Sequence, residues 1–264
     1  MVHGRAVADD EQQKWPDTLW IVRHGESAGN VAREAAYRTG LARIDVDVRD
    51  VDVPLSPLGE RQARALGRWF GGLPPVDRPT VVLASTYLRA ARTAELICQE
   101  AGLDADEVNF TRDERLREKE FGILDRFTRT GIREHHPEQA ELRLVLGKFY
   151  HRPPGGESWC DVILRLRSVV DTLTREYRRE RVLIVCHSVV VLCFRYLLER
   201  MTEDQILEID RTDEVANCSI TEYGFDRSRG KRGKLVLRSY NTVVPLLDEG
   251  APITAEPDVK APAP

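Results

Sequence analysis

The residues of this chain that best suit chemistry begin with a histidine at the end of an apolar run. In TLWIVRHGESAGN, residues 18–30, the apolar residues are typical of a buried strand, which would place Arg23 and His24 at a sheet edge, where open α/β proteins bind ligands. Arg23 is a planar bidentate donor suited to an oxyanion, and Ser27 can begin a helix whose free N–H groups point toward the same place. A lone histidine after a strand is more often a hydrogen-bonded structural residue, so this stretch leaves both roles open.

A second histidine repeats this arrangement. The run RVLIVC, residues 181–186, predicts another apolar strand, which ends at His187 and is followed by a helix that begins near Ser188. Because parallel strands release their carboxyl ends at one edge of a sheet, both imidazoles are expected in one crevice. A third strand, in TVVLAS, leads into a helix whose first turn carries Arg89, while Arg92 is expected on the surface of that helix.

Two arginines, two histidines and helix N-termini form a site for a dianion, and phosphate is the obvious candidate. A neutral imidazole can attack phosphorus while the cations offset the charge that spreads over the equatorial oxygens. The leaving oxygen then needs a proton, which a carboxylic acid can donate if the site raises its pKa. Candidates for this acid lie in and beside RLREKEFG, and the spacing does not choose among Glu114, Glu118 and Glu120.

Residues 18–240 resemble the histidine phosphatase superfamily, also called the phosphoglycerate mutase-like family. The matching segments, in the family's order, are VRHGES, PLSPLGERQA, STYLRAARTAE, LREKEFG, PPGGESW and VLIVCHS. The resemblance implies a three-layer α/β/α fold, a covalent phosphohistidine intermediate and no metal or other cofactor. It implies that His24 becomes phosphohistidine, that Arg23 and Arg89 bind phosphate, that Glu118 is the acid and that His187 is the second histidine.

Hydrolysis of a small phosphate monoester is the leading hypothesis, and two alternatives stay open. A mutase would use the same residues, but VAREAAYRTGLARIDVDVRDVDV, after Asn30, does not resemble the corresponding stretch of phosphoglycerate mutases. A binding or scaffolding module would keep the pocket without turnover, which the complete set of candidate groups disfavours. Ser188 and Thr86 stand where the family often has Gly and Pro, and either could shift a loop without removing a catalytic group.

Further candidates for substrate binding are Ser27, Asn30, Glu157 and Ser188. Asn30 either reaches the phosphate from the first helix or only hydrogen-bonds its own backbone. Glu157 precedes a capped helix and could simply favour its positive end, while the family resemblance adds a possible site role. The substrate is expected to enter past residues 149–152, whose two aromatic side chains are interpreted as packing.

An α/β fold must position these residues. Apolar, β-branched runs at TLWIV, TVVLAS, RVLIVC, CSITEYGF and KLVLRSY alternate with helical patterns, which favours a mainly parallel central sheet. In LSPLGERQARALGRWFGG, Ser56 can cap a helix, Pro57 suits its first position and the double glycine suits its end. Residues 158–177 place their apolar side chains on one helix face, with Ser158 and Asp161 spaced as a capping box.

Domain boundaries follow from changes in composition. The main domain is predicted over residues 16–247, with an irregular segment at about 115–156 that forms an inserted cover with one or two helices over one end of the sheet. Residues 1–15 and 248–264 are polar or rich in Pro and Ala, and both are expected to be disordered.

Composition disfavours several classes of protein. Among 264 residues, 39 Lys and Arg against 43 Asp and Glu give a net charge of −4, without a like-charge block suited to nucleic acid or a membrane surface. No apolar run approaches the roughly 18 residues that span a bilayer. Five cysteines without a CxxC pair indicate neither a disulfide framework nor a zinc site, and six histidines include no HxH or HExxH motif. We therefore expect a soluble, cytoplasmic protein that acts on a small-molecule phosphate ester, with its oligomeric state open.

Overall fold

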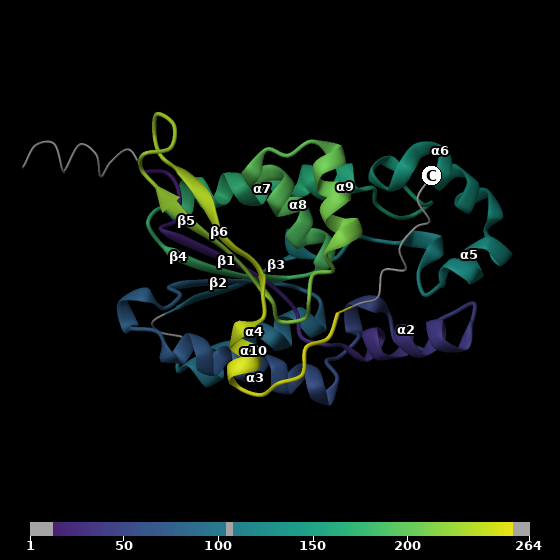
Figure 1. Cartoon of the computed structure of the whole chain (residues 1–264), viewed down its shortest axis with the longest axis horizontal. Coiled ribbons are helices and arrows are strands. Elements are labelled where there is room, and N and C mark those ends of the chain that lie inside the picture. The colour runs from purple at the N-terminus through teal and green to yellow at the C-terminus, as the bar shows by residue number, and fades with distance from the viewer. Residues whose placement is uncertain (1–12, 104–107, 256–264) are drawn as a thin grey trace, which may run out of the picture.

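The computed structural model describes residues 13–103 and 108–255, which form one six-stranded sheet with helices on both faces (Figure 1). The strand order is β3-β2-β4-β1-β5-β6. Four strands run parallel to one another, namely β1 (Thr18–Arg23), β2 (Val81–Ser85), β3 (Asn109–Asp113) and β4 (Arg181–Cys186). β5 (Ile220–Asp226) pairs antiparallel with β1, and β6 (Lys234–Thr242) pairs antiparallel with β5. The predicted α/β fold with a mainly parallel sheet is confirmed.

Alternation along the strands divides the core into two layers. In β1, Leu19 and Ile21 belong to one buried cluster, whereas Trp20 and Val22 belong to the other. The helices of the first layer are α7 (Trp159–Glu176), α8 (Ser188–Glu199) and α9 (Glu203–Thr212). The second layer contains α3 (Pro57–Gly72), α4 (Leu88–Ala101) and α10 (Val244–Asp248), on the opposite face of the sheet (Figure 1). Burial on both faces explains why the central strands are continuous apolar runs.

Local capping residues define the ends of the helices. Ser56 Oγ accepts a 3.0 Å hydrogen bond from Gly59 N at the start of α3, which begins with Pro57 and ends at the double glycine. At the start of α7, Ser158 Oγ accepts from Asp161 N at 3.2 Å, and the Asp161 carboxylate accepts from Ser158 N at 2.8 Å. Both predicted helices are confirmed, since each cap satisfies backbone donors that a helix leaves free.

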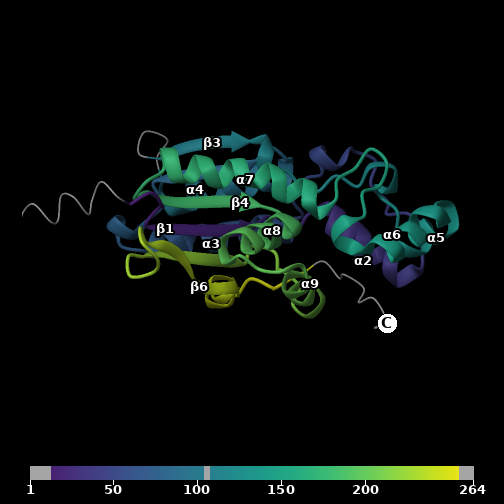
Figure 2. The same ribbon diagram turned by 90° about the horizontal axis from the view of Figure 1, so that it is seen from above.

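A cover extends beyond the carboxyl ends of the parallel strands (Figure 2). It contains α5 (Arg129–His135) and α6 (Pro137–Tyr150), which fall in the predicted cover segment, and also α2 (Ala28–Thr39) with the loop 40–53. Arg126 joins the two parts by donating hydrogen bonds to Val46 O and Val48 O, both at 2.8 Å. The cover is therefore built from two segments, and the cover insertion predicted at about 115–156 corresponds to the second of them.

Two parts of the described chain differ from expectation. The sequence did not indicate β3, because this edge strand is mostly exposed and lacks an apolar pattern. The second difference lies near the C-terminal end of the described residues. Gln62 Nε2 donates to Pro252 O at 2.8 Å and to Thr254 Oγ1 at 3.0 Å, so part of the tail that was expected to be disordered docks on α3. Trp15 likewise packs against the core, whereas residues 1–12 and 256–264 lie outside the described residues.

Within residues 13–103 and 108–255, no helix combines the length and the apolar character that a bilayer crossing requires.

Candidate active site

His24 and His187 lie side by side at the carboxyl edge of the sheet. Arg23 in β1 is paired with Cys186 in the parallel neighbour β4, so the residue after each strand reaches the edge at the same level. The two imidazole centroids are 5.1 Å apart, and the residues are 3% and 0% exposed. The predicted meeting of the two imidazoles at one sheet edge is therefore confirmed.

Hydrogen bonds orient the ring of His24. Its Nδ1 lies 2.7 Å from Gly25 O, an acceptor that requires a proton on Nδ1. Arg89 Nε then donates to Nε2 at 3.3 Å, so Nε2 carries the lone pair. Burial, followed by the charges of Arg89 and Arg23, lowers the pKa of His24 well below its ordinary value. The imidazole is thus neutral near pH 7, as a nucleophile must be.

His187 is the N-cap residue of α8, and its Nε2 lies 2.8 Å from the Ser85 hydroxyl oxygen. Burial, followed by the charge of Arg89 and of other nearby cations, lowers the pKa of His187 well below its ordinary value. Within the described residues, its buried Nδ1 has no hydrogen-bond partner. A buried ring nitrogen of this kind is suited to a hydrogen bond with a bound oxyanion.

Two nearly buried guanidinium groups adjoin the histidines, with Arg23 at 1% and Arg89 at 6% exposure. Arg23 Nη1 donates to Val215 O at 2.5 Å. Arg89 lies in the first turn of α4, as predicted, and its Nη1 and Nη2 donate to the two carboxylate oxygens of Asp50 at 3.0 and 3.2 Å. Its Nη1 also donates to Asp50 O at 2.6 Å.

Asp50 is a site residue that the sequence did not indicate. It begins the 3-10 helix η1 (Asp50–Asp52), within the repetitive stretch DVDVRDVDV, where nothing distinguishes it from the neighbouring aspartates. A carboxylate on both terminal nitrogens of Arg89 uses the same fork that arginine offers to a phosphate. Asp50 therefore contacts the nitrogens of Arg89 that a bound anion would use.

The three candidate acids differ in their surroundings. Glu114 is exposed at the surface. Glu118 is 8% exposed, and its Oε1 accepts a 2.8 Å hydrogen bond from Lys119 N. The side chain of Glu120 is 44% exposed and accepts a 2.6 Å hydrogen bond from the hydroxyl of Tyr87. The assignment of the proton donor to Glu118 stays a prediction.

Tyr87 contacts Glu120 through its hydroxyl group and the buried His187 and Arg89 through its ring. The sequence did not indicate a role for this tyrosine. Its ring centroid lies 5.2 Å from that of His187 and 5.1 Å from the guanidinium carbon of Arg89. Burial, followed by the hydrogen bond and the charge of Glu120, raises the pKa of Tyr87 well above its ordinary value. The phenol therefore stays protonated and donates to the carboxylate.

Ser27 and Asn30 form the capping box of α2. Asn30 Oδ1 accepts hydrogen bonds from the backbone N and the hydroxyl of Ser27, both at 3.0 Å, and Asn30 N donates to Ser27 Oγ at 3.1 Å. These bonds link the Asn30 side chain to Ser27 and not to its own backbone. Ser188 is the first residue of α8 and is partly buried beside His187. Substrate binding by these residues stays a prediction.

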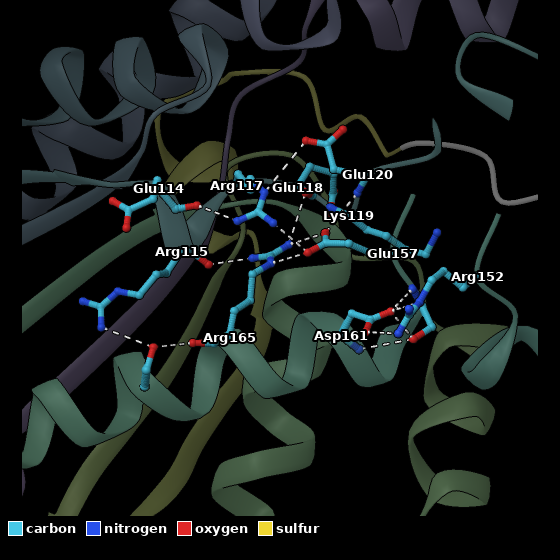
Figure 3. Close-up of polar contacts among 12 residues, drawn as sticks. Glu114, Arg115, Arg117, Glu118, Lys119, Glu120, Arg152, Glu157, Asp161 and Arg165 are labelled. Atoms are coloured by element: carbon cyan, nitrogen blue, oxygen red, sulfur yellow. Dashed lines mark hydrogen bonds and ion pairs between the residues drawn. The ribbon is translucent and has the colours of Figure 1, made fainter. Parts of the chain in front are cut away.

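Glu157 lies beside two arginines (Figure 3). Its carboxylate accepts hydrogen bonds from Arg165 Nε at 2.9 Å, Arg117 Nη2 at 2.8 Å and Glu120 N at 3.1 Å. Burial opposes ionisation, but the hydrogen bond and charge of Arg165, with the other donors, hold the pKa of Glu157 below its ordinary value. These contacts fix the position of the Glu157 carboxylate. Its role in substrate binding stays a prediction.

Residues 149–152 of the cover have mixed environments. Phe149 is 4% exposed and belongs to the core, which agrees with its interpretation as packing, whereas Tyr150 is 54% exposed. His151 is 2% exposed, and Arg152 Nη2 pairs with Asp161 at 2.5 Å. Among the described residues, no group of three His, Cys, Asp or Glu side chains is arranged to hold a metal ion.

The neighbouring imidazoles and guanidinium groups agree with a match between residues 19–237 and the histidine phosphatase superfamily (branch 1). The chain belongs to this superfamily. A similar curated protein is the "Probable phosphoglycerate mutase GpmB" of Salmonella paratyphi C, which is 27% identical over 235 residues, or 88% of this chain and 97% of that protein.

Solved structures of the superfamily share this fold. Bacillus stearothermophilus YhfR aligns with a TM-score of 0.66 and 25% identity over 86% of this chain and 97% of its own. The mycobacterial glucosyl-3-phosphoglycerate phosphatase Rv2419c, in complex with VO3, aligns with a TM-score of 0.62 and 23% identity over 86% of this chain and 99% of its own. The superfamily supports a general phosphatase or mutase activity for this chain.

Proposed function

We propose that this protein hydrolyses small phosphate monoesters through a phosphohistidine formed on Nε2 of His24. The observation that carries this proposal is the hydrogen bonding of the His24 ring, in which Gly25 O holds the Nδ1 proton and leaves the Nε2 lone pair beside Arg89. The lowered pKa of His24 supports the same assignment, because a protonated imidazole has no lone pair with which to attack.

In the first step, Nε2 of His24 attacks phosphorus and the bond from phosphorus to the ester oxygen breaks. Arg23, Arg89 and His187 would hold the phosphoryl oxygens, since their groups converge on the same sheet edge. Glu118, in its protonated form, would transfer a proton to the leaving oxygen, so that the alcohol departs neutral.

In the second step, the carboxylate of Glu118 would take a proton from water as the water oxygen attacks phosphorus. The bond from phosphorus to Nε2 breaks, inorganic phosphate leaves and His24 regains its lone pair. One residue thus acts first as acid and then as base, which restores the starting protonation state after each turnover.

The proposed substrate is a small-molecule phosphate ester whose alcohol portion lies against the cover. Asp50 of the loop 40–53 contacts Arg89, and Glu120 of the cover segment contacts Tyr87, so both parts of the cover reach the edge of the site. These contacts support selection of the alcohol by the cover, with the phosphoryl group bound at the sheet.

The first test is hydrolysis of p-nitrophenyl phosphate by the wild type and by His24→Ala, with EDTA present throughout. We expect turnover by the wild type and none above background in His24→Ala, with His135→Ala as a control because His135 is an exposed histidine. Alkaline quenching of the wild type during turnover should trap an acid-labile phosphoprotein that His24→Ala lacks. Equal turnover by the wild type and His24→Ala would refute the proposal.

A mutase is the second candidate, because the similar GpmB protein carries the name of a probable phosphoglycerate mutase. Both reactions would use the same phosphohistidine, and they differ in whether water or a rebound hydroxyl accepts the phosphoryl group. Interconversion of 3-phosphoglycerate and 2-phosphoglycerate that depends on a bisphosphorylated primer would favour the mutase. Absence of this interconversion, together with release of inorganic phosphate, would favour the hydrolase.

A further inference from the structure

The segment that carries the candidate acids has little regular structure of its own. The 3-10 helix η3 (Glu114–Leu116) precedes it and η4 (Gly122–Leu124) follows, while residues 118–121 belong to neither helix nor strand. No ladder of backbone hydrogen bonds therefore sets the position of Glu118 or Glu120. Their positions must depend on contacts with other elements.

Arg165 of α7 supplies several of these contacts (Figure 3). Its Nη1 donates to Arg115 O at 2.6 Å, and its Nη2 donates to Glu118 O at 3.2 Å. The same guanidinium binds both carboxylate oxygens of Glu157, at 2.9 and 3.0 Å. The side chains of Arg165 and Glu157 are 11% and 12% exposed, so this bidentate pair is largely removed from water.

Glu157 extends the connection to the next part of the segment. Glu157 N donates to Glu120 O at 2.9 Å, and Glu120 N donates to Glu157 Oε2 at 3.1 Å, which closes a two-way link between the two residues. The backbones approach closely here, since a Cβ on Gly122 would lie 2.1 Å from Pro154 O. Arg117 Nη2 also donates a hydrogen bond to the Glu157 carboxylate, in addition to the two nitrogens of Arg165.

We propose that Arg165 and Glu157 are positioning residues for the proton donor, and we name this pair the α7 clamp. The inference rests on the proposed function. The clamp acts by holding the backbone at Arg115, Glu118 and Glu120 against α7, so that the donor carboxyl group meets the leaving oxygen. In this proposal Glu157 does not bind substrate.

The physical argument is that proton transfer requires donor and acceptor within hydrogen-bond reach. A displacement of about 1 Å can cost on the order of 100-fold in rate. Loss of Arg165 would also leave the Glu157 carboxylate partly buried with fewer cations, which favours its movement toward water and carries Glu120 with it. The clamp therefore affects the step that breaks the ester bond more than binding of the phosphoryl group.

Leaving-group dependence separates this role from a merely structural one. p-Nitrophenolate departs without a proton, whereas phenolate from phenyl phosphate needs one, and the two esters are similar in shape. In Arg165→Met we expect kcat/KM for phenyl phosphate to fall by about 10- to 100-fold, and kcat/KM for p-nitrophenyl phosphate by less than about threefold. We compare kcat/KM because it reports the steps up to the breaking of the ester bond, whereas kcat also includes hydrolysis of the phosphohistidine, in which Glu118 is the base for both esters.

Two further variants sharpen the test. Glu157→Gln keeps an amide oxygen for Glu120 N but loses the charge, so we expect a smaller change in the ratio for the two esters, in the same direction. The double variant should resemble Arg165→Met alone, since both changes act on one interaction. Arg175→Met is the matched control, because Arg175 lies on the same helix in an exposed pair with Asp171 and should keep the wild-type ratio of the two kcat/KM values.

Each outcome has one meaning. The ratio of the two kcat/KM values does not depend on the fraction of folded enzyme, and circular dichroism reports the fold of each variant. A wild-type ratio in folded Arg165→Met, or an equal loss of kcat/KM on both esters, would overturn the clamp while leaving the proposed hydrolysis intact. No wild-type turnover of either ester would overturn the proposed function, and the clamp with it.

Discussion

The phosphoryl end of the site and its cover are built in different ways. Arg23, His24 and His187 stand where two paired strands end, and each is at most 3% exposed. At the cover, the side chains of Asp50 and Glu120 lie on irregular segments and are 37% and 44% exposed. Sheet hydrogen bonds therefore determine where the two histidines and Arg23 lie, whereas the surrounding carboxylates depend on loops and a single 3-10 turn.

The largest effect is expected at the phosphoryl end. Arg89→Met removes a buried cation from the proposed phosphate site and should lower kcat/KM for p-nitrophenyl phosphate by about 10²- to 10³-fold, the loss typical of one oxyanion donor. Arg92→Met is the matched control, because the Arg92 side chain is 40% exposed and pairs with Glu95. Equal activities of the two variants would show that the buried guanidinium does not bind the phosphoryl group.

The buried histidines should also make stability depend on pH. Their lowered pKa values mean that the unfolded chain binds more protons than the folded protein, so the free energy of unfolding rises with pH and falls below about pH 6.5. Each buried histidine contributes up to about 1.4 kcal/mol per pH unit there, until it titrates in the folded state.

Urea unfolding of the wild type and His24→Asn between about pH 7 and pH 5 measures this contribution. The variant should show the smaller pH dependence, because one titrating group is gone. His135→Asn, at an exposed histidine, should keep the wild-type dependence. A wild-type dependence in His24→Asn would mean that His24 titrates normally when folded.

A smaller effect is expected where the cover reaches the phosphoryl end. Asp50→Asn keeps the shape of the side chain but removes the charge that occupies Arg89, so inorganic phosphate should inhibit about tenfold more strongly. Asp52→Asn is the control, since Asp52 pairs with the exposed Arg49. Weaker inhibition in Asp50→Asn would show that Asp50 orients Arg89 for phosphate rather than competing with it.

The smallest effect tests whether the cover is an independent unit. Thr128 Oγ1 caps α5 by accepting from Gly131 N at 3.1 Å and also donates to Leu41 O at 2.7 Å. Thr128→Ala should weaken the cover by about 1 kcal/mol, which is about a fivefold increase in hydrogen exchange over the loop 40–53 and α5. Unchanged exchange in the central strands would support two units, whereas an equal increase there would indicate one cooperative structure.

Local signals explain how much could be predicted. The runs at β1 and β4, the Ser56 cap of α3 and the capping box of α7 depend on residues close together in the chain, so their positions were predictable. The meeting of His24 and His187 was predictable as well, because parallel strands release their ends at one edge. Such patterns do not locate β3, whose exposed residues pair with only one neighbour.

Distant contacts were not predictable from these patterns. Asp50 meets Arg89 and Tyr87 meets Glu120 across more than 30 positions of sequence, and nothing in their local spacing marks either pair. The docking of the residues just before position 256 was not predictable either. A tail rich in Pro and Ala is typical of disorder, and only the structure shows that Gln62 Nε2 donates a hydrogen bond to Pro252 O.

By itself the sequence determined the mainly parallel sheet, the helices with their caps and the gathering of His24, His187 and Arg89 at one edge. Strand periodicity, capping chemistry and strand direction act locally or follow from a general rule of parallel sheets. Only the tertiary structure decided that Asp50 pairs with Arg89 and that Arg165 and Glu157 bind the backbone of the segment around Glu118 and Glu120. Those contacts depend on how separate loops and helices pack, because a side chain's partners are selected by three-dimensional proximity and not by distance along the chain.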